Sequence, residues 1–113
     1  MARPLRIQFA DATYHITNRG NERRPIFFGD EDRTAFLEYL AATVKRFGWS
    51  VTAWVLMTNH FHLVVQTPEP NLSKGMQWLE GSFATWINKR RRRSGHLFGG
   101  RFDAVLVARY DPL

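Results

Sequence analysis

Two strand-like segments joined by a short turn, in the middle of the chain, constrain its fold more than any other feature. Residues 49–57 and 60–66 are rich in β-branched and aromatic side chains, and Thr58-Asn59 lies between them. A two-residue connection of this kind is typical of an antiparallel hairpin. Pro68 then ends the second segment, because proline cannot donate to a strand ladder. The sequence therefore predicts a central β-hairpin.

Segments with helical periodicity flank this hairpin. Upstream, Asp30 is the expected N-cap of a helix and Gly48 its expected C-cap. Downstream, Asn71 is the expected cap of a second helix that ends in the basic run 89–93. The apolar stripes predicted to face the core are Phe36, Tyr39, Leu40, Val44 and Phe47 in the first helix, and Leu72, Met76, Leu79, Phe83 and Ile87 in the second. Gly75 and Gly81 are expected to weaken the second helix by about 1 kcal/mol each relative to alanine.

One more strand is predicted near each end of the chain, at residues 12–18 and 103–109. A basic loop follows the first strand, and its Gly20 and Asn21 tolerate the positive φ of a turn. The order is then β-α-β-β-α-β, which with right-handed crossovers gives a ferredoxin-like α+β fold. We expect one domain over residues 1–113, with both helices on one sheet face and the first and third strands at the centre.

The composition narrows the classes of function. No cysteine is present among the 113 residues, which excludes disulfides and thiolate metal sites. No apolar run reaches the length of a membrane span, so we expect a cytoplasmic protein without a membrane partner. The formal net charge is +6 and the pI about 10.5. Basic residues gather at 3–6, 19–24 and 89–93, a distribution suited to a phosphate backbone.

His60 and His62 are the sharpest candidates for chemistry. Side chains alternate along a strand, so these two imidazoles point to the same face, about 6–7 Å apart. Two neighbouring imidazoles can share a divalent cation, with a third ligand or a substrate phosphate completing its shell. The spacing alone is equally compatible with two structural strand histidines, and both readings stay open at this point.

The residues around this pair resemble a known family. The segment Met57-Thr58-Asn59-His60-Phe61-His62-Leu63-Val64 is similar to the HUH signature of single-tyrosine transposases, especially the REP-associated tyrosine transposases. The resemblance extends over nearly the whole chain. Its other blocks are 14–21 (YHITNRGN), 71–78 (NLSKGMQW), 94–98 (SGHLF) and 100–102 (GRF).

The resemblance implies a reaction on DNA. In that family the two histidines, here His60 and His62, bind Mg²⁺ or Mn²⁺, which polarises the scissile phosphate of single-stranded DNA. A tyrosine then attacks the phosphorus, giving a 5′-phosphotyrosine link and a free 3′-hydroxyl. Single-stranded or hairpin DNA is the implied partner. Members often dimerise, so a homodimer is compatible with the resemblance.

The sequence departs from the family pattern at its C-terminal end. The family's tyrosine lies on a helix after the fourth strand, and an Asn or Gln four positions later supplies a third metal ligand. This sequence ends at Leu113, so the expectation is a truncated or decayed transposase, or a piece of a longer protein, with impaired cleavage. Tyr14 and Tyr39 are expected to pack. Tyr110 is the weak remaining candidate for the nucleophile, because proline at 112 disfavours a helix there.

Basic residues in three places are the expected DNA contacts. Arginine suits both phosphates and guanine edges. The candidates are Arg19, Asn21, Arg23 and Arg24 in the first loop, Lys89, Arg90, Arg91, Arg92 and Arg93 after the second helix, and Arg101. For the run 89–93 a solvated helix end is the alternative. His15 is expected to have a structural partner or to support His60, His96 to be structural, and Asn59 to hold the hairpin or a histidine.

Two other functions remain open. The first is a nucleic-acid-binding module without chemistry, although an RNA-binding sheet is disfavoured because no matching Gly-Phe-rich strand is present. The second is a hydrolase that uses a metal-bound water. It needs a general base near His60 and His62, and only Glu69, Glu80 and Asp103 are available, without motif spacing.

Overall fold

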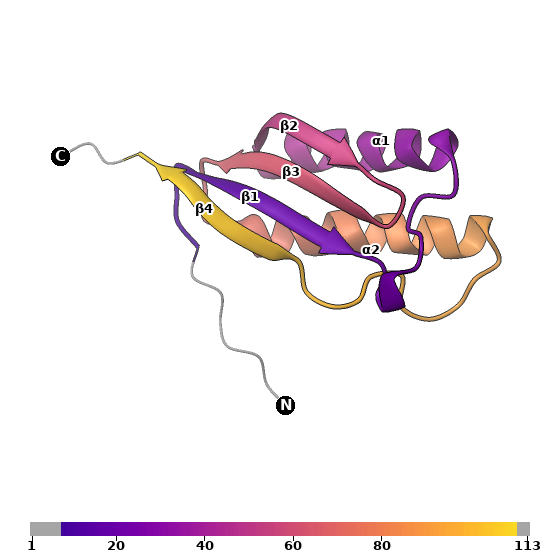
Figure 1. Cartoon of the computed structure of the whole chain (residues 1–113). Coiled ribbons are helices and arrows are strands. Elements are labelled where there is room, and N and C mark those ends of the chain that lie inside the picture. The colour runs from indigo at the N-terminus through magenta and orange to yellow at the C-terminus, as the bar shows by residue number, and fades with distance from the viewer. Residues whose placement is uncertain (1–7, 111–113) are drawn as a thin grey trace.

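Strands and helices alternate in the order β-α-β-β-α-β in the computed structural model, which describes residues 8–110. The elements are β1 (Ala12–Arg19), the short 3-10 turn η1 (Asn21–Arg23), α1 (Asp30–Phe47), β2 (Ser50–Leu56), β3 (His60–Thr67), α2 (Leu72–Arg90) and β4 (Asp103–Arg109). The sheet order is β2-β3-β1-β4, and every neighbouring pair is antiparallel (Figure 1). The predicted ferredoxin-like α+β fold is confirmed, with β1 and β3 at the centre.

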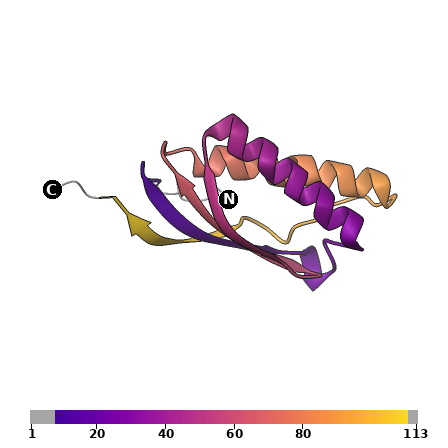
Figure 2. The same ribbon diagram turned by 90° about the horizontal axis from the view of Figure 1, so that it is seen from above.

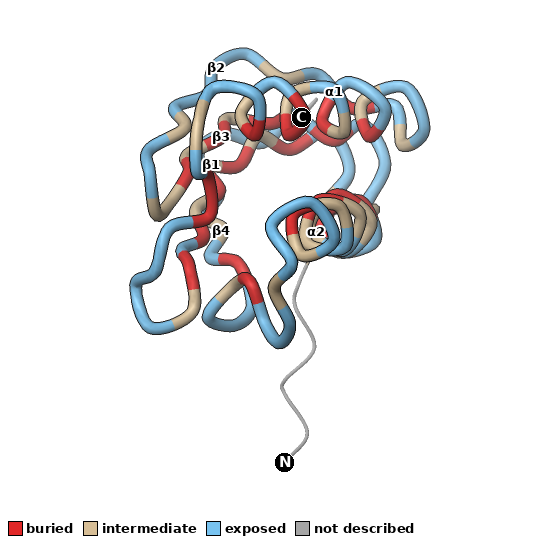
Figure 3. The backbone as a smooth tube through the Cα atoms, turned by 90° about the vertical axis from the view of Figure 1, so that its right-hand side faces the viewer, coloured by how far each residue is buried: buried red, intermediate tan, exposed pale blue. Residues whose placement is uncertain are grey.

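Both helices cover the same face of the sheet (Figure 2). Every second residue of β1 and β3 is buried against them, and the buried segments of the chain face inward (Figure 3). The predicted stripe of α2 is fully buried, whereas in α1 only Phe36 and Leu40 are buried and the other three stripe residues are partly buried. The opposite sheet face has no helix over it within residues 8–110. Neither described helix is apolar enough over its length to cross a membrane.

The helix ends follow the sequence with one correction. Gly48 closes α1 in the left-handed conformation at φ 75°, as predicted. Asp30 is not the N-cap of α1, because Gly29 occupies that position and Asp30 is the first helical residue. The side chain that reaches back is that of Asp32, whose Oδ2 accepts a hydrogen bond from the backbone N–H of Phe28 at 2.7 Å. A carboxylate one turn into the helix thus satisfies a free N–H before it.

Asn71 is the N-cap of α2, as predicted, but its side chain does not cap the helix. Its Oδ1 accepts from Nε1 of Trp49 at 2.8 Å, and its Nδ2 donates to the carbonyl of Phe47 at 2.9 Å. Trp49 lies over the first turn of α2, where Gly75 leaves room for its ring. Asn71 therefore ties the end of α1 to the start of α2.

The basic loop after β1 has a different conformation from the one predicted. Gly20 has φ −64°, and the positive φ values belong to Glu22 and Arg23, at 54° and 59°. Gly20 is needed for another reason. A Cβ there would lie 1.9 Å from the carbonyl oxygen of Arg24, so the turn closes too tightly for a side chain.

Candidate functional site

His60 and His62 lie side by side on the open face of the sheet, as their spacing predicts. The ring centroids are 5.2 Å apart and the planes are at 83°. Phe61 between them is fully buried on the opposite face. Antiparallel pairing with β1 places His62 opposite Thr17 and His60 opposite Arg19. The pair therefore lies at the end of the sheet where the basic loop leaves β1.

Asn59 holds the ring of His60. Its Oδ1 lies 2.9 Å from Nδ1 of His60, and its Nδ2 donates to the carbonyl of Arg23 at 3.1 Å. Since that carbonyl can only accept, the amide must direct its nitrogen toward Arg23 and its oxygen toward His60. His60 then carries its proton on Nδ1, which leaves the Nε2 lone pair for a ligand. The expectation that Asn59 supports a histidine agrees with this geometry.

His62 has a partner on the neighbouring strand, His15. Nε2 of His15 lies 3.1 Å from Nδ1 of His62, and the two ring centroids are 5.2 Å apart with the ring planes at 16°. His15 was expected to have a structural partner or to support His60, and the partner that it contacts is His62. The alternation of β1 and β3 puts the three imidazoles on one face.

The pKa of His62 lies below its ordinary value. Partial burial is the main cause, because desolvation disfavours the charged imidazolium, and the neighbouring His60 and His15 add smaller effects in the same direction. These effects favour the neutral imidazole of His62. A neutral imidazole is the form that binds metal.

The donor set around this pair is incomplete. Within residues 8–110 no three His, Cys, Asp or Glu side chains form a cluster with metal-binding geometry. Asp103 pairs with Thr17 from the other side, so it shares the row of His62 two strands away, about 10 Å distant at ordinary strand spacing. Two imidazoles suit a divalent cation whose remaining positions are filled by water or phosphate oxygens.

None of the described tyrosines lies beside the histidines. Tyr14 is buried under the sheet, where its hydroxyl accepts from the N–H of Phe9 at 2.9 Å, and Tyr39 packs edge-on against Trp78. Tyr110 is exposed and donates its N–H to the carbonyl of Asp11, at the other end of β1. Asp11 lies six positions before Thr17, the residue opposite His62, which corresponds to about 20 Å along a strand. The structure therefore does not bring Tyr110 to the histidines.

The first basic loop is adjacent to His60. Arg19 is exposed opposite it across the β1–β3 pair. No side-chain partner is found among the described residues for Arg19 or Arg23, whereas Arg24 pairs with Glu22 at 3.1 Å. Two predicted DNA-binding arginines thus have guanidinium groups that a phosphate can approach without breaking an ion pair in the described part of the chain.

Three loops are joined by backbone hydrogen bonds at this end of the molecule. The N–H of Gly20 donates to the carbonyl of Asn59, and the N–H of Asn21 to that of Leu97, both at 2.9 Å. The N–H of Gly99 donates to the carbonyl of Arg19 at 3.0 Å. The loop after β1, the β2–β3 turn and the loop before β4 therefore form one connected platform around the histidines.

The basic run after α2 divides into two groups. Arg91 and Arg90 approach the buried carboxylate of Asp32 at 3.0 and 3.4 Å, and Arg90 also pairs with Glu31. Arg91 and Arg93 additionally lie over the ring of Phe28. The exposed Lys89 and Arg92 have no ion pair within the described part of the chain. These two remain the most accessible candidates of the run for phosphate contact.

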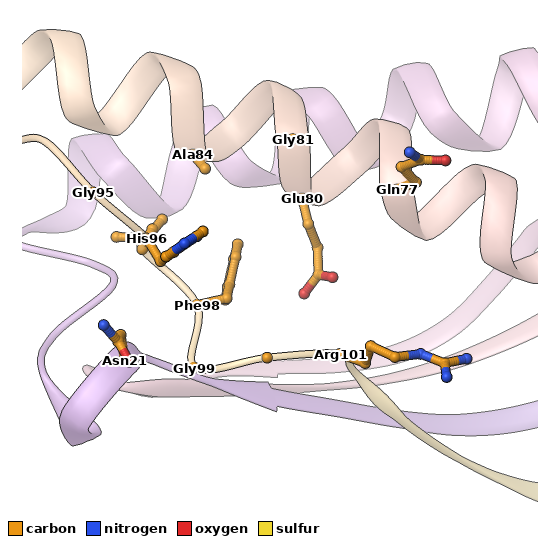
Figure 4. A pocket seen from close by; sticks show the side chains of 12 residues that line it. Asn21, Gln77, Glu80, Gly81, Ala84, Gly95, His96, Phe98, Gly99 and Arg101 are labelled. Atoms are coloured by element: carbon orange, nitrogen blue, oxygen red, sulfur yellow. The ribbon is translucent and has the colours of Figure 1, made fainter. Parts of the chain in front are cut away.

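A pocket of about 550 Å³, which sequence reasoning missed, lies between α2 and the loop before β4. Asn21 and Arg101, both predicted DNA contacts, are among its lining residues, with Phe98 and Glu80 (Figure 4). Glu80 points into the pocket while its Oε2 accepts from Nδ2 of the buried Asn18 at 2.6 Å. The signal in the sequence was the helical spacing of Gln77, Glu80, Gly81 and Ala84 opposite a glycine-rich loop.

Comparisons with known proteins agree with this arrangement. Residues 8–109 match the family profile described as IS200-like transposase. No significant match to a curated protein sequence was found. A REP-associated tyrosine transposase bound to a REP hairpin superimposes with a TM-score of 0.78 at 14% identity, over 97% of this chain and 64% of that one. A candidate transposase from Deinococcus radiodurans superimposes with a TM-score of 0.69 at 17% identity, over 96% and 85%. The chain thus spans less than two thirds of the first of these structures.

Proposed function

Because the chain belongs to the IS200-like transposase family, we propose that it binds single-stranded or hairpin DNA and holds one phosphate of that strand at His60 and His62. The observation that carries the proposal is the arrangement of these imidazoles on the open face. Each has a hydrogen-bond partner at Nδ1, at 2.9 Å for His60 and 3.1 Å for His62. Each can therefore present Nε2 to a shared cation.

Mg²⁺ or Mn²⁺ is the cofactor proposed for this pair. A bound cation would act as a Lewis acid on a phosphate oxygen, and that oxygen would complete its shell. Asn59 fixes the donor atom of His60, and Arg19 brings a positive charge to the same row of the sheet. These residues would bind and orient the phosphate before any bond is broken.

Hairpin DNA is the substrate class that we favour. One structure that shares this fold is that of a transposase bound to a REP hairpin. The exposed guanidinium groups of Arg19 and Arg23 lie on the platform that surrounds the histidines, where they can contact the phosphates on either side of the held one. Lys89 and Arg92 would extend this contact along the molecule.

The family's cleavage step needs a tyrosine that none of residues 8–110 brings to the histidines. We propose that it comes from a longer form of the protein or from a second copy in a homodimer. In either case cleavage would form a phosphotyrosine bond and release a 3′-hydroxyl. The alternative of a hydrolase has one supporting observation, the carboxylate of Asp103 in the row of His62. It predicts cleavage without a covalent adduct.

Removal of both histidines is expected to abolish the metal-dependent part of DNA binding. We expect Mn²⁺ to tighten binding of a labelled hairpin oligonucleotide to the wild-type chain, and to have no effect on the His60→Ala/His62→Ala variant, because no cation is then held. Native gels with and without Mn²⁺ measure this difference. Gln66→Ala, on the same strand and face, should behave as wild type. If Mn²⁺ tightened binding equally in the double variant, the cation would not bind at His60 and His62.

The salt dependence of binding should identify the phosphate contacts. Arg19→Ala and Arg23→Ala are each expected to lower the slope of log K against log [salt] by about 1, because each releases one counterion fewer. Lys45→Ala is the charge-matched control, since Lys45 is exposed near the C-terminal end of α1, away from the histidines. Fluorescence anisotropy over a salt series gives the slopes. Equal slopes for all three variants would exclude the loop after β1 from the interface.

A further inference from the structure

His15 occupies a defined position relative to His62 because of the pairing of the two central strands. β1 and β3 are antiparallel, with His15 opposite Val64 and Thr17 opposite His62. His15 and His62 are therefore diagonal neighbours on the open face, a spacing that long or aromatic side chains can bridge. The ring centroids lie 5.2 Å apart, and the ring planes are only 16° apart. This contact depends on the register of the sheet and does not arise from neighbouring positions in the sequence.

The contact occupies one ring nitrogen of His62. Nδ1 lies 3.1 Å from Nε2 of His15, which is a hydrogen-bonding distance. A hydrogen bond between two imidazole nitrogens uses the proton of one and the lone pair of the other, so neither nitrogen is then left for a cation. Nε2 of His62 is consequently the nitrogen left for an outside ligand.

The same arrangement is found at His60 with a different partner. There Nδ1 faces Oδ1 of Asn59 at 2.9 Å, again leaving Nε2. Two residues from different elements, Asn59 in the hairpin turn and His15 in β1, thus each engage Nδ1 of one histidine. A hydrogen bond at the non-ligating nitrogen fixes the tautomer and the ring orientation of a metal-binding histidine.

We infer that His15 is a positioning residue that accepts a hydrogen bond from Nδ1–H of His62 and so keeps Nε2 of His62 unprotonated and directed outward for the cation. This inference rests on the proposed function, because it assigns His15 a role in the same metal site. His15 is not itself a ligand, since accepting at Nε2 leaves its own proton on Nδ1 and no lone pair for a cation. It acts through His62, as Asn59 acts through His60.

Three variants separate this role from simple packing. His15→Phe keeps an aromatic ring beside His62 but removes the acceptor. His15→Gln places an amide oxygen near the former position of Nε2 and restores the acceptor. Thr13→Ala, on the same strand and face, is the control for the sheet, because Thr13 pairs with Gln66, four positions along β3 from His62.

The primary measurement is the tautomer of His62 in the metal-free protein, read from long-range ¹H–¹⁵N correlation spectra of the imidazole nitrogens. We expect Nδ1–H at His62 in the wild type, Thr13→Ala and His15→Gln, and loss of that signal in His15→Phe. The second measurement is calorimetric titration with Mn²⁺. His15→Phe should bind it roughly 10–100-fold more weakly, the usual effect of removing such a partner, and His15→Gln should recover most of the affinity.

The outcomes separate this inference from the function on which it rests. If Mn²⁺ binds the wild type at His60 and His62 but His15→Phe keeps both the Nδ1–H tautomer and full affinity, His15 is only a packing residue. An Nε2–H signal at His62 in the wild type would overturn the inference in the same way. If the wild type does not bind Mn²⁺ at these histidines, the proposed metal site itself is wrong, whatever the tautomer.

Discussion

Replacement of Asp32 by alanine is expected to lower the free energy of unfolding by about 2–4 kcal/mol, because it leaves the N–H of Phe28 unsatisfied and removes the buried carboxylate that pairs with two half-buried arginines. The side chain of Asp32 is fully buried, and its Oδ2 accepts from the N–H of Phe28 at 2.7 Å. Its two oxygens also face Nη2 of Arg91 at 3.1 and 3.0 Å. One carboxylate thus joins the first turn of α1 to the end of α2.

Urea unfolding followed by tryptophan fluorescence measures this loss. Asp30→Ala is the matched control, since that carboxylate is fully exposed two residues earlier and pairs with Arg33 only at 3.4 Å. Little change is expected for it, because exposed ion pairs contribute little. Asp32→Asn should fall between the two, as its amide oxygen can still accept from Phe28. If Asp32→Ala and Asp30→Ala unfolded at the same urea concentration, the pairing of Asp32 with the basic run would have no part in stability.

Alanine at Gly75 is expected to destabilise the fold by about 2–3 kcal/mol, although alanine is the better helix former. A Cβ at this position would lie 2.0 Å from Cζ2 and 2.5 Å from Cη2 of Trp49. The ring cannot move away without losing other contacts, because Trp49 is only 3% exposed and its Nε1 donates a hydrogen bond to Asn71. The steric cost therefore exceeds the gain in helix propensity.

Gly81 gives the opposite expectation in the same helix. No atom lies within 4 Å of a Cβ placed there, so Gly81→Ala should stabilise the protein by roughly 0.5–1 kcal/mol. Thermal or urea unfolding of the two single variants measures whether each substitution raises or lowers the free energy of unfolding. Stabilisation by alanine at both positions would mean that Trp49 is not held against α2.

The helices and strands could be predicted from the sequence because the spacing of apolar residues shows which side chains face the core. The stripe of α2 is buried at every predicted position, and the period of β3 puts Phe61 inside and both histidines outside. The conformation of Gly20 was missed, because its constraint is the carbonyl of Arg24, an atom placed only when the turn closes. Local patterns do not contain such tertiary contacts.

The same limit applies to charges and to the site. The burial of Asp32 could not be predicted, because its carboxylate pairs with Arg91, which is 59 positions away in sequence. His60 and His62 could be found from spacing and from the family resemblance. The partner of His62 could not, because the diagonal contact with His15 depends on the register between β1 and β3.

The backbone ties between the three loops have a consequence for any strand that binds there. Loops usually lose conformational entropy when they close on a ligand, and that loss reduces affinity. Here the N–H groups of Gly20, Asn21 and Gly99 are already bonded across loops. The end of the molecule that carries the histidines is therefore ordered before contact. Most of the conformational entropy lost when a complex forms would then be lost by the nucleic acid. A strand already folded into a hairpin should therefore bind better than an unstructured one.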